Sequence, residues 1–202
     1  MDVEVQSAQV PPPARRRVFT FEPGGPTWWY VMRMGLVAVL GALVVAVPVQ
    51  LLLQSDDPRA EMLESHFLVA AFAMIVVAPL LETLLMALFF GIATFFSKNL
   101  HRLALVSALC WGVLHVFNSP TNAIAVLWPF YIMSRVYLAW RRIGLWKAMG
   151  VTALVHALIN ALALVMAGLF AALGEAPPSD LTSPPTLQQY APVDQSQHQY
   201  LP

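Results

Sequence analysis

The sequence predicts an all-α protein, a polytopic membrane helical bundle of about five transmembrane helices. Of the 202 residues, 58% are hydrophobic and only 11% are charged, against about 25% charged residues in a typical soluble domain. The apolar residues also gather into stretches of about 20, the length that an α-helix needs to cross a bilayer. Basic and acidic residues are equal in number, at 11 each, so we expect no nucleic-acid partner.

Five apolar stretches predict the five spans. The first, at about 28–54, begins with the aromatic residues "WWY", which favour the membrane–water interface. It is too long for the apolar region of a signal peptide, so we expect it to be retained. The second, at about 67–97, contains Pro79 and is favoured as one crossing, kinked or divided at the proline. The other three are expected at about 103–118, 122–140 and 148–173.

The two ends of the chain differ from these spans in composition. Residues 1–27 are polar and contain several prolines, while 174–202 are rich in proline, glutamine and serine and hold no lysine or arginine. The second composition is typical of a disordered segment. The sequence therefore predicts a polar N-terminal segment at 1–27, a transmembrane domain at 28–173 and a disordered tail at 174–202.

The distribution of basic residues predicts the orientation, because lysine and arginine favour cytoplasmic loops. The loop after the first span holds one arginine, Arg59, amid four acidic residues. The alternate loops are basic, with Arg15, Arg16, Arg17, Lys98, Arg102, Arg141, Arg142 and Lys147. We therefore expect a bacterial inner (cell) membrane protein with a cytoplasmic N-terminus and the tail outside.

Four polar residues interrupt the apolar spans: Glu82 in "APLLETLLMALFF", His115 in "WGVLHVFN", and His156 and Asn160 in "LVHALINAL". A carboxylate at the centre of a membrane helix costs about 2.5–3.5 kcal/mol, so such groups are functional candidates. Counted along each helix from the nearest basic residue, all four fall in one slab about 10 Å thick. His156 and Asn160 are one turn apart and share a helix face.

These residue types fit the hydrolysis of an amide bond. A carboxylate such as Glu82 can take a proton from water that an imidazole such as His115 positions. His156 and Asn160 supply two donors for a developing oxyanion, so no serine or cysteine nucleophile is needed. Glu82, His115 and His156 are also a possible zinc ligand set, drawn from three helices. We favour the metal-free site and expect no cofactor.

The same positions resemble the motifs of the CPBP (CaaX protease and bacteriocin-processing, Abi) family of intramembrane endopeptidases. That family's pattern is a proline-preceded E-E-x-x-x-R, then F-x-x-x-H, then H-x-x-x-N or H-x-x-x-D. Here Glu82 stands at the first glutamate, and Trp111 replaces the phenylalanine before His115. The segment "HALIN" matches the last motif fully, with His156 and Asn160. The resemblance covers about 78–165 and implies a four-helix core within about 67–173.

The resemblance implies that Glu82 and His115 activate water, that His156 and Asn160 form the oxyanion site, and that the substrate is a membrane-anchored or lipidated peptide or protein. The sequence departs from the pattern at Thr83, in place of the second glutamate, and at Ala87, in place of the arginine. A non-catalytic membrane scaffold or immunity-type protein of the same fold is therefore the alternative. A small transporter or proton relay is a second alternative, although no internal repeat of the kind many transporters show is visible.

Overall fold

The computed structural model describes residues 20–53, 65–117 and 119–174 of the chain. Chain contacts divide the protein into two units, residues 1–164 and 165–202, and every contact discussed below lies within the first. The predicted tail, most of the polar N-terminal segment and the acidic loop around Arg59 lie outside the described residues.

The described residues form helices and no strands, which confirms the predicted all-α bundle. Four helical stretches are long and apolar enough to cross a membrane, and the third predicted span is a shorter helix, α5. The elements are α1 (Thr27–Leu53), α3 (Phe67–Phe72), the π-helical turn η1 (Ala73–Val77), α4 (Ala78–Phe96), α5 (Leu100–His115), α6 (Pro120–Ala125), α7 (Leu127–Arg141) and α8 (Leu145–Gly174).

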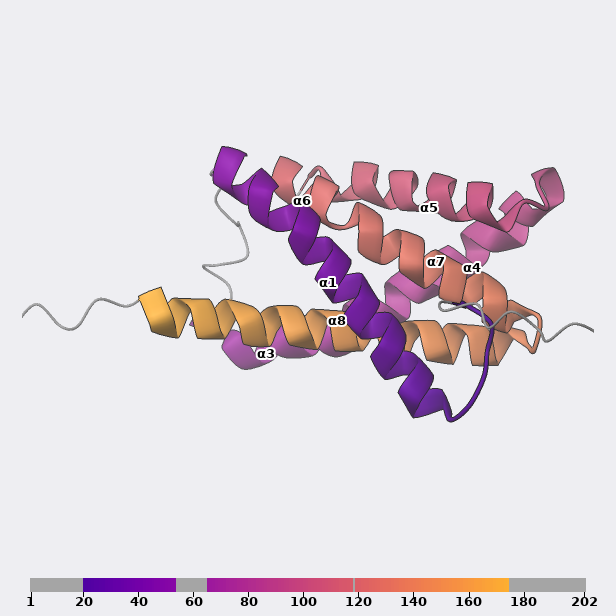
Figure 1. The fold of residues 1–202 in the computed structure, drawn as a ribbon, viewed down its shortest axis with the longest axis horizontal. Coiled ribbons are helices and arrows are strands. Elements are labelled where there is room, and N and C mark those ends of the chain that lie inside the picture. The colour runs from indigo at the N-terminus through magenta and orange to yellow at the C-terminus, as the bar shows by residue number, and fades with distance from the viewer. Residues whose placement is uncertain (1–19, 54–64, 118, 175–202) are drawn as a thin grey trace, which may run out of the picture. The chain divides into compact units, whose positions relative to one another are not determined.

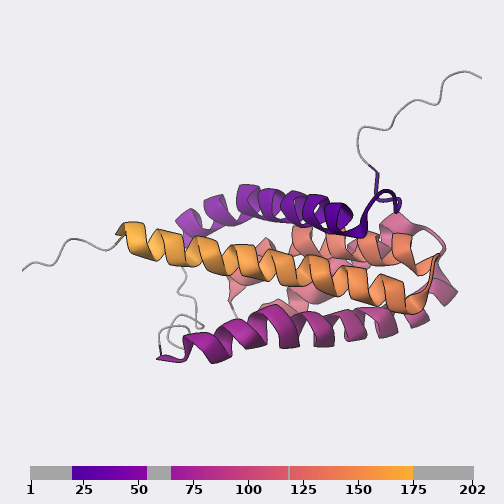
Figure 2. The same cartoon turned by 90° about the horizontal axis from the view of Figure 1, so that it is seen from below.

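The second span is one continuous helix, because α3, η1 and α4 follow one another without a break (Figure 2). The π-turn lies directly before Pro79. In an α-helix the N–H of Ala78 would bond to the carbonyl of Met74, but here it bonds to the carbonyl of Ala73. A proline at position 79 has no N–H to offer in its place. The turn therefore leaves the Met74 carbonyl without a partner from its own helix.

The central helix is α7, which lies between α5 and α8 in Figure 1 and between α1 and α4 in Figure 2. It belongs to the least apolar of the four long spans, yet that span is the most buried. A hydrogen bond of 2.9 Å joins the buried hydroxyls of Ser134 on α7 and Ser107 on α5. Small polar pairs of this kind hold membrane helices together, so Ser134 of α7 faces a neighbouring helix.

The outer surface is apolar, as a lipid-facing surface must be. On α4 the residues Pro79, Thr83, Met86 and Phe90 form the buried stripe. Leucines such as Leu80, Leu84 and Leu88 are exposed on the same helix. The buried residues recur every three or four positions, which is the spacing of residues on one face of a helix. The leucines between them therefore lie on the opposite, outer face.

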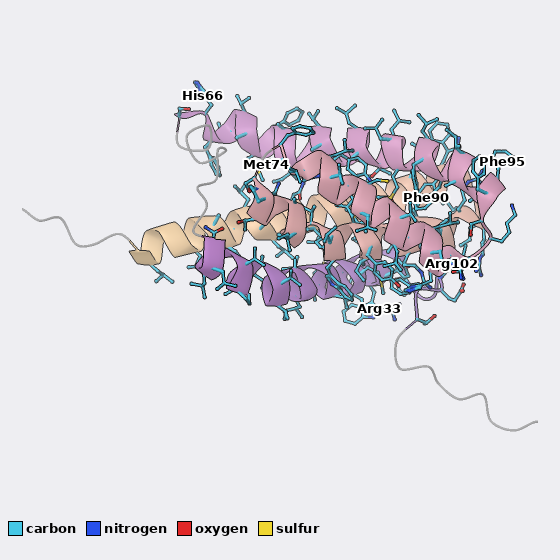
Figure 3. The ribbon with its side chains drawn as sticks, turned by 90° about the horizontal axis from the view of Figure 1, so that it is seen from above. Arg33, His66, Met74, Phe90, Phe95 and Arg102 are labelled. Carbon is cyan, nitrogen blue, oxygen red and sulfur yellow. The ribbon has the colours of Figure 1, made fainter. Side chains whose placement is uncertain are left out.

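One end of the bundle is basic. Figure 3 shows Arg33 and Arg102 at this end and His66 at the other. The residues that lead into α1 are fixed here, because Tyr30 Oη donates to the carbonyl of Phe21 at 2.8 Å and Arg33 donates to the carbonyl of Thr20 at 3.0 Å. We call this region the basic end.

Candidate functional site

The structure brings Glu82 of α4 to His156 of α8. Glu82 Oε2 lies 3.8 Å from His156 Nε2, and the two side chains are 22% and 8% exposed. Glu82 directly precedes Thr83, a member of the buried stripe of α4, and therefore lies at the edge of the inner face of that helix. The sequence places these residues 74 positions apart on separate spans, and the fold alone makes them neighbours.

The carboxylate of Glu82 is incompletely paired. Its Oε2 atom is buried and has no hydrogen-bond partner within the described ranges. The distance to His156 exceeds the roughly 2.7–3.2 Å of an N–H···O hydrogen bond. Buried polar atoms in folded proteins are nearly always hydrogen-bonded, so an orphaned carboxylate oxygen marks a place where a ligand or water is expected.

His115 ends helix α5, and its own helix fixes its tautomer. Its Nδ1 atom lies 2.8 Å from the carbonyl oxygen of Trp111, one turn earlier. A carbonyl oxygen only accepts hydrogen bonds, so Nδ1 carries the proton. In the neutral ring Nε2 then bears the lone pair and is the proton acceptor. His115 therefore suits the role of a base or water-positioning group better than that of a donor.

Phe130 of α7 links the two histidines. Its ring centroid lies 5.3 Å from that of His115 and 5.8 Å from that of His156. Trp111 stacks on Phe130 at 4.6 Å, with 10° between the ring planes. These rings hold both imidazoles against one apolar centre. As one apolar residue among many in its span, Phe130 carries no signal in the sequence that identifies this role.

Asn160 is directed toward the π-turn. Its Nδ2 atom donates to the carbonyl of Met74 at 2.7 Å, which is the carbonyl that the π-turn and Pro79 leave unpaired. Asn160 thus contacts the second span at Met74, eight residues before Glu82, and this amide N–H serves the backbone. The second N–H of the same amide group is a further donor.

Two buried hydroxyls accompany the site and were missed from the sequence. Thr83, beside Glu82, and Thr152, one turn before His156, are both buried, and within the described residues neither hydroxyl oxygen has a hydrogen-bond partner. The spacing of Thr152 and His156 places them on one face of α8, a signal that the sequence does contain.

The alternative zinc set of Glu82, His115 and His156 lies around one apolar centre. Glu82 and His156 approach to 3.8 Å, and Phe130 contacts both histidines. Over residues 20–53, 65–117 and 119–174, no three histidine, cysteine, aspartate or glutamate side chains form a group close enough to hold a metal ion.

Comparisons with known proteins identify no relative of this chain. The chain matches no protein-family model, no curated protein and no solved structure.

Proposed function

We propose that the chain is an intramembrane endopeptidase that cleaves a peptide bond of a membrane-anchored or lipidated substrate, as members of the CPBP family do. The observation that carries this proposal is the buried pair of Glu82 and His156, with an orphaned carboxylate oxygen 3.8 Å from an imidazole nitrogen. Ionisable groups inside a membrane span have a high free-energy cost, so such a pair is expected at a functional site.

The pair has the geometry to hold one water. Two atoms 3.8 Å apart can both reach a water at about 2.8–3.0 Å. In this mechanism Glu82 takes a proton from the water, whose oxygen attacks the substrate carbonyl. When the tetrahedral intermediate collapses and the C–N bond breaks, the protonated Glu82 gives this proton to the leaving amine. The tetrahedral oxyanion is stabilised by donors such as the second N–H of Asn160. His115, protonated on Nδ1, offers Nε2 as an acceptor that orients the attacking water.

The experiment compares membranes of cells that produce the wild-type chain or Glu82→Gln, which keeps shape and hydrogen bonding but removes the basic carboxylate. Mass spectrometry of new peptide N-termini should find cleavages in the wild type that are absent from the variant. Thr94→Val is the matched control on the same helix, because Thr94 Oγ1 only bonds back to the carbonyl of Phe90. Identical N-termini for wild type and Glu82→Gln, at equal protein levels, would reject the proposal.

One observation favours the second candidate, a non-catalytic scaffold of the same fold. Asn160 bonds to the backbone of η1, which is what an asparagine with a purely structural role does. On this alternative, Glu82→Gln and Asn160→Ala both leave the peptide N-termini per folded molecule unchanged, although Asn160→Ala reduces stability. The two functions are therefore separated by cleavage per folded molecule, not by stability.

The proposal includes an orientation. The basic end would face the cytoplasm of a bacterial inner membrane, because the positive-inside rule assigns clustered lysine and arginine to that side. Arg33 and Arg102 both lie toward this end (Figure 3), and Arg102 belongs to a loop that the sequence marks as basic.

A further inference from the structure

A groove lies between α1 and α5. Both helices pack on α6 and α7, and the space that they leave over α7 has a volume of about 840 Å³. Its walls are apolar, with Val37 from α1, Leu105 and Leu109 from α5, and Ile124 and Trp128 from the α6–α7 segment. This volume lies within the ~300–1,000 Å³ of pockets that bind one small molecule.

The groove is separate from the Glu82–His156 site. No residue of α4 or α8 lines it, whereas Glu82 and His156 lie on those two helices. On α7 the two regions use different faces, because Phe130 contacts the histidines while its neighbour Tyr131 lines the groove. Successive residues of an α-helix point about 100° apart, so one helix serves both regions.

Three polar side chains lie beside one end of the groove, whose own walls are almost wholly apolar. His101 Nδ1 lies 3.0 Å from Tyr131 Oη, and both residues line the groove. Arg135 Nη1 donates to the same Tyr131 Oη at 3.2 Å. The Arg135 guanidinium also lies 4.6 Å from the centroid of Phe21, a third lining residue. Imidazole, phenol and guanidinium therefore gather where the apolar walls end.

Arg135 forms no ion pair with a carboxylate among the described residues. Within the described ranges the ion pairs are Arg142 with Glu22 and His156 with Glu82, so Arg135 has no carboxylate partner there. Arg135 is only partly exposed, and a half-buried guanidinium favours an anion that can accept its fork of donors.

We propose that this groove binds one anionic phospholipid of the surrounding bilayer, with an acyl chain along its walls and the phosphate at His101 and Arg135. An apolar channel that ends beside a guanidinium and an imidazole matches an amphiphile with an apolar chain and a negative head. Basic pockets between membrane helices on the cytoplasmic side bind such head groups. The site is independent of the proposed peptidase activity.

The test measures lipid retention on the delipidated full-length chain in detergent by native mass spectrometry. Dioleoyl phosphatidylglycerol and dioleoyl phosphatidylcholine are added at equal concentration. One phosphatidylglycerol per chain should be retained in preference to phosphatidylcholine. Arg135→Gln should reduce this preference by about fivefold or more, the equivalent of one lost cationic contact. Arg141→Gln, which removes a charge from the same helix away from the groove, should leave the preference unchanged.

A second pair of variants tests the apolar part without touching the charge or the core. Leu105→Trp fills the groove, whereas Val106→Trp adds the same side chain at a neighbouring position that does not line it. The two native residues are 43% and 50% exposed. Leu105→Trp should abolish phosphatidylglycerol retention and Val106→Trp should preserve it. Equal retention of both lipids, retention that survives Leu105→Trp, or a groove occupied by a second copy or by another segment of the chain would overturn the proposal.

Discussion

The amide of Asn160 on α8 donates a 2.7 Å hydrogen bond to the main-chain carbonyl of Met74 in the π-turn of the second span. That carbonyl lacks a partner in its own helix for two reasons. The N–H of Ala78 bonds one residue further back, and Pro79 has no N–H. A side chain 86 positions away thus completes the backbone hydrogen bonding of a membrane helix.

We predict that Asn160→Ala lowers thermal stability. Hydrogen bonds between membrane helices average about 0.6 kcal/mol, but here the loss leaves a carbonyl unpaired, which costs about 1–3 kcal/mol. Thermal unfolding of the detergent-solubilised chain measures this. If Asn160 also stabilises the oxyanion, turnover per folded molecule should fall by about 10²–10³. Unchanged turnover would assign Asn160 to structure alone.

We predict that Pro79→Ala reduces the cost of Asn160→Ala. Alanine restores an N–H at position 79, which can donate to the Met74 carbonyl or return the turn to α-helix. The double variant should therefore be more stable than the sum of the single changes predicts, with a coupling energy of about 0.5–3 kcal/mol. A double-mutant cycle on thermal unfolding tests this, and strict additivity would show that Pro79 does not cause the orphaned carbonyl.

We predict opposite effects for two substitutions of His115. His115→Asn keeps an amide N–H near the position of Nδ1, so the bond to the Trp111 carbonyl and the stability should persist while proteolysis is lost. His115→Gln places its amide near Nε2 and loses that bond, so stability should fall. Unfolding and N-terminal mass spectrometry measure both properties. Full activity of His115→Asn would exclude Nε2 from the chemistry.

We predict that Gly41→Ala destabilises the protein. The Trp128 indole crosses Gly41 to donate to the carbonyl of Val37 at 3.0 Å, and a Cβ at Gly41 would collide with that ring. Overpacking of this kind costs about 1–3 kcal/mol. Gly91→Ala is the matched control, because a Cβ there meets open space. Equal unfolding temperatures for the two variants would contradict the packing at Gly41.

We predict that reporters fused at residues 5 and 195 lie on opposite sides of the membrane, with residue 5 in the cytoplasm. The reason is the alternation of basic loops along five crossings. Activity of compartment-specific reporters measures this. Reporters on the same side would mean that the short α5 does not complete a crossing.

Much of the fold could be predicted from the positions and lengths of the apolar stretches alone. The stretches at 28–54, 67–97 and 148–173 correspond to α1, to the α3–α4 helix and to α8. The start of α5 was missed, although Asn99 is a readable cap whose side chain accepts from the N–H groups of His101 and Arg102. The π-turn was not predicted, since it is completed by Asn160 on another span.

The site could be predicted less completely. Glu82 and His156 were found because ionisable groups inside a span stand out. Their partners could not be found in the same way. Phe130 is an apolar residue in an apolar span, and the acceptor at Met74 is a main-chain atom that no side chain reveals. Which histidine meets Glu82 depends on helix packing, which a single sequence does not specify.

The length of α5 has a consequence for the surrounding lipid. Its 16 residues span about 24 Å, roughly 6 Å less than a hydrocarbon core of ~30 Å. Exposed Lys98 and Arg102 anchor its first turn at the polar surface, so the deficit falls at the end that carries His115. A hydrophobic mismatch of this kind is relieved by local thinning of the bilayer. The head-group layer would then dip toward His115 and bring water within reach of a site otherwise enclosed by hydrocarbon.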